Sequence, residues 1–280
     1  MKLLDLMFLA PYKKKIDGAI TKAIEEMGPK SKLRDAIEYS LTGEAKRFRP
    51  LMVLFIAEAT GNQDVMDAAL AVEFFHTASL IADDLPCMDD DDIRRNKPSL
   101  HKAYSEDVAL LASYTLIAQA YERLSIGATK LGQEGPSICQ KALQYVSKRA
   151  GILGATNGQY LDLYFKGDDL QTLNTITYQK TVTLFEISFA LGYLYGKGSI
   201  ENLSLITEAA NHIGYAFQIA DDLQDFDQDE SSLAKTLGKE KALELYKEHR
   251  ASYDRAMELA KVDHKGLSKL TKLLDALAGI

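Results

Sequence analysis

Apolar residues recur at every third or fourth position along most of the chain, with polar residues between them. This is the period of an amphipathic α-helix, and stretches in which β-branched and polar residues alternate are nearly absent. Leu33, Ile37 and Leu41 show the spacing, while Gly28-Pro29 and Gly61-Asn62 each end such a segment. The predicted helices cover Tyr12 to Met27, Leu33 to Leu41, Arg49 to Thr60, Val65 to Asp84, Asp107 to Leu124, Ser137 to Ala150, Leu173 to Tyr195, Leu203 to Asp225, Leu233 to Ala260 and Leu267 to Leu277. The pattern therefore predicts an all-α bundle of about ten helices with short connections.

Composition narrows the possible classes of protein. The 280 residues are 46% hydrophobic and contain no linker-like or repeated segment, which predicts a single domain spanning 1–280. A net charge of −7 argues against non-specific binding to nucleic acid. Cys87 and Cys139 are too few for a disulfide framework and favour a reducing cytoplasm. No segment reaches the roughly 18 apolar residues of a membrane span, and Met1 to Pro11 is not expected to be a cleaved signal because Asp5 interrupts it.

Two acidic segments that follow apolar runs are the main candidates for chemistry. The first, Leu80 to Asp92, carries Asp83, Asp84 and Asp89, and the second, Phe217 to Asp225, carries Asp221, Asp222 and Asp225. Helical residues four apart share a face, so Asp221 and Asp225 are expected to reach one ion with Asp222 at its flank. Clustered carboxylates without nearby histidine or cysteine suit Mg²⁺.

The spacing in the first segment requires a break in the helix. Asp89 lies six residues after Asp83, and Pro86 predicts a bulge or break that returns Asp89 to the face of Asp83. The further run from Asp90 to Asp92 is interpreted as solvated surface, as most charged runs are.

Basic residues precede one predicted helix. Lys46, Arg47 and Arg49 form a candidate diphosphate clamp, because guanidinium groups match phosphate oxygens and helix starts favour anions; a solvated basic turn is the alternative. His76 lies one to two turns before Asp83 on the same side of its helix, where a buried structural histidine is the alternative interpretation.

Together these segments resemble the trans-isoprenyl diphosphate synthase family, most closely its short-chain geranylgeranyl and farnesyl members. The family carries an aspartate-rich DDxx(xx)D motif and a second motif, FQxxDDxxD, in the order found here. Gly43 to Pro50 is similar to its GGKRxRP block, Gly158 to Leu163 to its GQxxDL block, and Lys180-Thr181 to its KT pair. The resemblance runs from about Leu33 to Asp229, and it implies the isoprenoid synthase fold, with helices around a central cavity.

The resemblance also implies a role for each matching residue. It assigns Mg²⁺, roughly three ions bound with the substrate diphosphate, to Asp83, Asp84, Asp89, Asp221, Asp222 and Asp225. Isopentenyl diphosphate would be bound by Lys46, Arg49, His76 and Arg95, and the allylic diphosphate by Arg94 and Lys180. Thr181 and Gln218 would stabilise a carbocation, Gln159 and Asp162 would line the cavity, and Ala78 and Ser79 would influence product length.

The implied activity is a transferase reaction of isoprenoid biosynthesis. Isopentenyl diphosphate would add head to tail to dimethylallyl, geranyl or farnesyl diphosphate, and the small Ala78 favours geranylgeranyl diphosphate (C20) as product. Farnesyl diphosphate (C15) synthase, a weakly active or regulatory subunit, and a class I terpene cyclase are the alternatives. The resemblance further implies a homodimer.

Three features depart from the family pattern. Glu44-Ala45 replaces the glycine pair of the basic block, and Ser113-Tyr114 stands where the family often has Gly-Asp. The segment after Asp225 is shortened and lacks the lysine that completes the allylic diphosphate clamp. Either Lys235 or Lys239 substitutes for it, or the site closes less fully.

Overall fold

The computed structural model describes residues 3–165, 167, 169–227 and 232–280. Its helices are α1 (Leu3–Glu26), α2 (Lys32–Leu41), α3 (Phe48–Thr60), α4 (Met66–Asp83), α5 (Leu100–Ala103), α6 (Glu106–Thr129), α7 (Gly135–Ala150), α8 (Ala155–Tyr164), α9 (Leu170–Ile176), α10 (Thr183–Tyr195), α11 (Leu203–Gln224), α12 (Leu233–Leu237), α13 (Lys239–Leu259) and α14 (Lys265–Leu277). A π-helical turn, Thr177–Val182, connects α9 to α10. Two short strands, β1 (Ile93–Arg94) and β2 (Lys97–Pro98), form a hairpin. The prediction of an all-α fold is confirmed.

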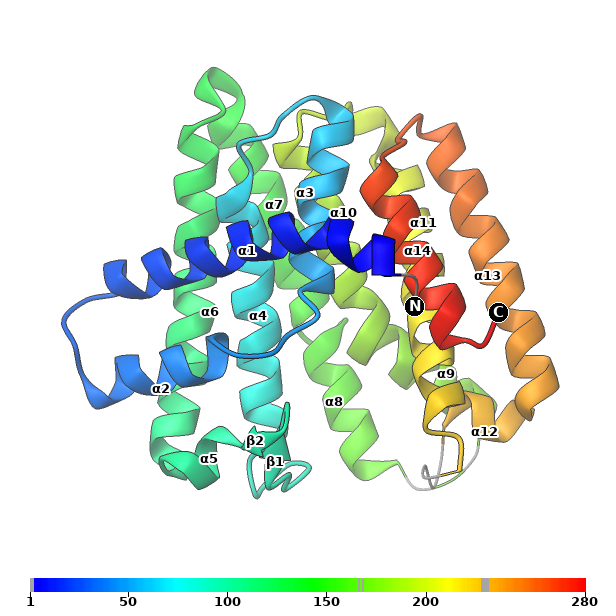
Figure 1. Ribbon diagram of the computed structural model, residues 1–280, viewed down its shortest axis with the longest axis horizontal. Coiled ribbons are helices and arrows are strands. Elements are labelled where there is room, and N and C mark those ends of the chain that lie inside the picture. The colour runs from blue at the N-terminus through cyan, green and yellow to red at the C-terminus, as the bar shows by residue number, and fades with distance from the viewer. Residues whose placement is uncertain (1–2, 166, 168, 228–231) are drawn as a thin grey trace.

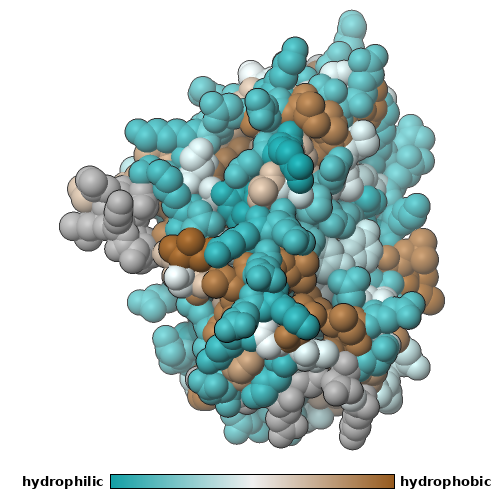
Figure 2. All heavy atoms as spheres, turned by 90° about the vertical axis from the view of Figure 1, so that its right-hand side faces the viewer, coloured by the Kyte–Doolittle hydropathy of each residue, from teal (hydrophilic) through white to brown (hydrophobic). Residues whose placement is uncertain are grey.

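The helix α10 forms the centre of the bundle. Every residue from Phe185 to Tyr195 is buried, which explains why the segment is apolar on all faces. It packs against α3, α7 and α11, while α4 packs along α6 and α11 along α13. Figure 1 shows α1 lying across the front of α4 and α3 and reaching toward α14. The face formed by the C-terminal helices is largely hydrophilic, with hydrophobic residues gathered in smaller patches (Figure 2).

Several predicted helices differ from the structure. The first helix begins at Leu3 rather than at Tyr12, and the expected helix from Leu173 to Tyr195 is divided into α9, the π-helical turn and α10. The expected helix from Leu233 to Ala260 is divided at Gly238, whose φ of 82° is not helical and separates α12 from α13. The helix α8 was not indicated by the sequence pattern, because its apolar residues do not follow one helical stripe.

Two histidines meet where α11 packs on α13, and they predict a pH-dependent stability. His212 Nδ1 and His249 Nδ1 lie 2.9 Å apart. Burial is the main cause that lowers the pKa of His249 to about 4, and the charge of the neighbouring His212 is the second cause. Between pH 6.5 and 4 the unfolded chain binds a proton that the folded chain excludes, so stability present above this window is lost as pH falls through it. We expect His249→Gln to lose less thermal stability than the wild type between neutral pH and about pH 5. Equal losses in both proteins, measured by circular dichroism, would contradict this.

Candidate functional site

A cavity of about 830 Å³ opens between α3, α4, the π-helical turn and α11. It brings together residues that are far apart in the sequence: Lys46, Arg49, His76, Asp83, Asp89, Arg94, Arg95, Lys180, Thr181, Gln218 and Asp221. The sequence had singled out each of these residues. Four further residues line the cavity without having been predicted: Lys13, Phe48, Glu73 and Asn96. The cavity is therefore cationic on one side and acidic on the other.

The first acidic segment ends a helix and turns back on itself. The helix α4 stops at Asp83, and the chain bends at Pro86 as the sequence predicted. The backbone N–H of Asp89 donates to the carbonyl of Asp83 at 2.9 Å, which returns Asp89 to the cavity. Burial raises the pKa of Asp83 to about 6, although Lys180 opposes the shift.

Asp84 has a different environment from Asp83. It is buried, and its Oδ1 accepts a hydrogen bond of 2.8 Å from Arg94 Nε. Arg94 also pairs with Asp91 at 2.7 Å. Asp84 is not among the described residues that line the cavity. Its carboxylate instead fixes the position of Arg94.

The adjacent aspartates of the second acidic segment, Asp221 and Asp222, also have different environments. Asp221 lines the cavity, whereas the buried Asp222 accepts hydrogen bonds from Gln218 Nε2 at 2.8 Å and from the backbone N–H of Ala234 at 3.2 Å. Gln218 Oε1 in turn accepts from Thr181 Oγ1 at 2.8 Å. Asp225 follows the end of α11, is exposed and does not line the cavity. The backbone N–H of Asp225 donates to Asp221 O at 3.1 Å, so Asp225 follows Asp221 by one helical turn although its side chain is exposed.

Lys180 reaches the acidic side of the cavity from the π-helical turn. Its Nζ donates to Asp162 Oδ2 at 2.5 Å and lies 3.8 Å from Asp89 Oδ2. Burial opposes the charged form, but these carboxylates raise the pKa of Lys180. Gly158 lets α8 approach the turn closely, since a Cβ at this position would lie 2.3 Å from the backbone nitrogen of Lys180. Gln159 on the same helix donates to Asp89 at 3.2 Å.

Arg49 and His76 form the buried part of the cationic side. The Arg49 guanidinium lies over the Phe185 ring at 5.0 Å, and its Nη1 is 3.3 Å from His76 Nε2. A guanidinium only donates, so Nε2 accepts and Nδ1 carries the proton of a neutral ring. Burial lowers the pKa of Arg49 to about 10 and that of His76 well below its usual range.

Arg47 is engaged by other protein groups. It is 4% exposed, forms ion pairs with Glu73 and with Asp17 at 2.9 Å, and donates to the carbonyl of Leu41 at 2.6 Å. Lys46, by contrast, is exposed at the cavity. The basic turn thus contains one structural arginine and two residues available to an anion, Lys46 and Arg49.

The remaining predicted residues lie elsewhere. Ala78 is buried and its carbonyl accepts from Ser113, while Ser79 Oγ donates to the carbonyl of His76; neither lines the cavity. Lys235 and Lys239 both lie over the Phe226 ring, and neither of them lines the cavity. Part of the shortened segment, 228–231, is outside the described residues, as is Asp229 at the end of the resemblance.

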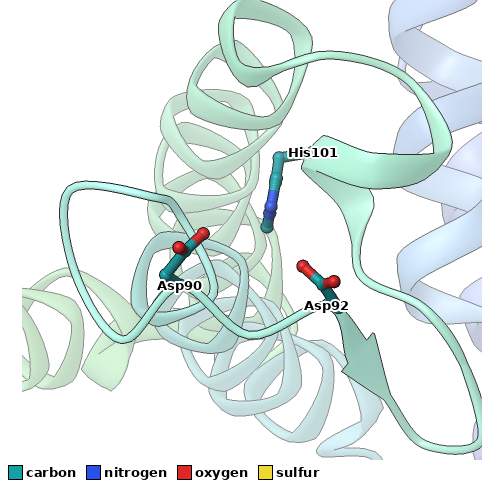
Figure 3. A group of neighbouring side chains, drawn as sticks. All are labelled: Asp90, Asp92 and His101. Carbon is teal, nitrogen blue, oxygen red and sulfur yellow. The ribbon is translucent and has the colours of Figure 1, made fainter.

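The donors that face the cavity fit a hard divalent cation. Asp83, Asp89 and Asp221 offer only carboxylate oxygens, the ligands that Mg²⁺ prefers, and Lys180 stands beside them. In the described ranges one group of three acidic or imidazole side chains has its ligand atoms within 4.8 Å of one another, and it lies outside this cavity: Asp90, Asp92 and His101 (Figure 3).

The comparisons with known proteins agree on one family. The sequence profile of the polyprenyl synthetase family matches residues 30–245. Geranylgeranyl pyrophosphate synthase 7, chloroplastic, of Arabidopsis thaliana is 38% identical over 232 residues, which cover 80% of this chain and 65% of that protein. The chain therefore spans less than two thirds of the length of this relative.

Solved structures resemble almost the whole chain. A geranyltransferase from Legionella pneumophila has a TM-score of 0.86 at 28% identity, covering 99% of this chain and 98% of its own. An FPP/GFPP synthase from Zymomonas mobilis has a TM-score of 0.81 at 29% identity, covering 97% and 99%. Across the described ranges, each helix is too short or too polar to span a bilayer.

Proposed function

Because this chain belongs to the polyprenyl synthetase family, we propose that it is a short-chain prenyl diphosphate synthase. It adds isopentenyl diphosphate head to tail to dimethylallyl, geranyl or farnesyl diphosphate, and the proposed product is geranylgeranyl diphosphate. One observation carries the proposal: a single cavity joins the acidic residues Asp83 and Asp221 to the cationic residues Arg49 and Arg95. Two diphosphates of different roles need such separated sites.

The acidic side suits the allylic diphosphate. Mg²⁺ held by Asp83, Asp89 and Asp221 would supply positive charge to the departing diphosphate. Lys180 Nζ and Arg94 donate fixed hydrogen bonds to the same leaving group, whose negative charge grows as the carbon–oxygen bond breaks. Asp84 positions Arg94 for this task.

The cationic side suits isopentenyl diphosphate. Lys46, Arg49 and Arg95 bind its phosphate oxygens, and the neutral His76 lies beside Arg49 on the same side of the cavity. The carbocation forms next to the Thr181 and Gln218 oxygens, which Asp222 holds in place through Gln218 Nε2. The isopentenyl double bond attacks this carbon, and the departing diphosphate takes the proton, so no protein base is required.

The test uses purified protein, radiolabelled isopentenyl diphosphate and each allylic starter, followed by chromatography of the dephosphorylated products. C20 chains from the protein alone support the proposal. Farnesyl chains as the end product would select the C15 alternative. A product formed without isopentenyl diphosphate would indicate a cyclase, and activity only with a partner protein would indicate a regulatory subunit.

Product length provides a further prediction. Ser79 lies one helical turn before Asp83, so an aromatic ring there projects beneath the acidic side of the cavity. We expect Ser79→Phe to shorten the main product from C20 to C15, whereas Ser79→Ala keeps the longer product. Chromatography of the product mixture measures the ratio, and an unchanged C20 fraction in Ser79→Phe would contradict this role.

The assembly proposed is a homodimer of single-domain chains, 1–280, in the cytoplasm. Large apolar side chains are exposed along one helix, α6: Leu110, Leu111, Tyr114 and Ile117, between 37% and 60% exposed. Such a stripe supports burial against a second copy. Sedimentation analysis gives the mass of the assembly.

A further inference from the structure

The three residues drawn in Figure 3 come from two segments that the β1–β2 hairpin separates in sequence. Asp90 and Asp92 follow the turn after α4, and His101 lies on α5. Their ligand atoms are within 4.8 Å of one another, and the imidazole projects toward the space between the two carboxylates. None of the three lines the cavity described above. The group is therefore separate from the proposed reaction site.

The histidine supplies an observation that a surface cluster of acids does not. His101 is only 8% exposed, and its Nδ1 lies 3.1 Å from Ser99 Oγ. Among the residues that the structure describes, none gives Nε2 a hydrogen-bond partner, although this atom is buried. A buried polar atom without a partner is costly, and the cost disappears when a ligand occupies its lone pair. A partner on the other ring nitrogen is also typical of metal-binding histidines.

The two segments are held together before any ion arrives. The backbone N–H of Asp90 donates to Leu85 O at 3.2 Å, and that of Ser99 donates to Asp92 O at 2.9 Å. Asp90 has a φ of 53°, a conformation that aspartate adopts more readily than most residues. The site is thus assembled by local backbone contacts, and only the exposed carboxylates need to rotate inward.

One cation already competes for this position. Lys102 Nζ lies 2.7 Å from Asp92 Oδ1, but the lysine side chain is 44% exposed and the aspartate 70%. Such a surface ion pair contributes little, so the lysine can swing into solvent when a divalent ion binds.

We propose that Asp90, Asp92 and His101 bind a first-row transition-metal dication outside the reaction cavity. An imidazole with two carboxylates favours Zn²⁺ or Co²⁺ over Mg²⁺, which prefers an all-oxygen shell. In a tetrahedral site the ligand atoms would close to about 3.4 Å from one another, with the fourth position open to water. The bound ion joins α5 to the segment that carries Asp89, and it therefore fixes a cavity residue from outside.

The test is a titration of the chelator-treated full chain with Co²⁺ or Zn²⁺, without any diphosphate. Visible absorption reports a nitrogen–oxygen cobalt site, and calorimetry gives the Zn²⁺ affinity. We expect Asp90→Asn and Asp92→Asn to weaken Zn²⁺ binding at least about tenfold, and His101→Asn to abolish the cobalt band. Lys102→Gln is expected to tighten binding, since it removes the competing cation.

Matched controls make the result decisive. His212→Asn removes another partly buried histidine, and Asp64→Asn removes another exposed aspartate that pairs with a lysine. Both are expected to keep the wild-type affinity. Should His101→Asn prove unfolded by circular dichroism, the two exposed aspartate variants and Lys102→Gln decide the matter.

Wild-type Zn²⁺ affinity in Asp90→Asn and Asp92→Asn, or Mg²⁺ binding as tight as Zn²⁺ binding, would overturn the proposal. Prenyl transfer measured in Mg²⁺ alone tests the proposed function separately, so either proposal can fail without the other.

Discussion

Asp83→Asn and Asp221→Asn are each expected to lower kcat by about 10²- to 10³-fold, because each removes a charge that faces the cavity. An asparagine keeps the size of the side chain but cannot hold a divalent cation with a full negative charge. The departing diphosphate then develops its charge with less compensation, so the loss appears in the chemical step. Steady-state rates at several Mg²⁺ concentrations measure it, and the variants should require more Mg²⁺ for half-maximal activity.

Asp225→Asn is the matched control for these variants. Asp225 belongs to the same motif, but it is exposed, follows the end of α11 and does not line the cavity. We expect its loss to change kcat by less than about tenfold. Near-normal rates in Asp83→Asn or Asp221→Asn would contradict the assignment of these residues as metal ligands. An equal loss in Asp225→Asn would show that Asp225 also acts in the reaction, although it does not line the cavity.

The sequence singled out many of the residues that line this cavity. Pro86 cannot continue a helix, so the return of Asp89 toward Asp83 follows from local chemistry. Spacing could not say which of two adjacent aspartates faces the cavity. Neighbours on a helix point about 100° apart, and the packing of α4 on α6 sets the rotation that turns Asp84 toward Arg94.

Other features depend on contacts between distant segments. The π-helical turn around Lys180 has no sequence pattern of its own, and the close approach of Gly158 accompanies it. Lys13 reaches the cavity because α1 crosses the bundle. His101 could not be joined to Asp90 and Asp92 from spacing, since the intervening hairpin sets their distance. These arrangements are decided by tertiary packing rather than by local propensity.

The largest effect on stability is expected at Arg47, which the sequence grouped with the substrate-binding cations. Arg47→Met leaves Glu73 buried without its partner, and breaking one side of a buried ion pair typically lowers the free energy of unfolding by about 3–5 kcal/mol. Urea denaturation followed by circular dichroism measures the loss. Lys46→Met, at the adjacent exposed position, should change the free energy by less than about 0.5 kcal/mol.

A double variant separates the ion pair from the shape of the site. Arg47→Met combined with Glu73→Leu replaces both charges of this pair by apolar groups, so neither partner is left without the other, and most of the stability should return. Because Glu73 also lines the cavity beside Arg49, the double variant is expected to be folded yet impaired in binding isopentenyl diphosphate. If Arg47→Met alone were as stable as Lys46→Met, the arginine would not be structural. The basic turn would then offer three cations to the substrate instead of two.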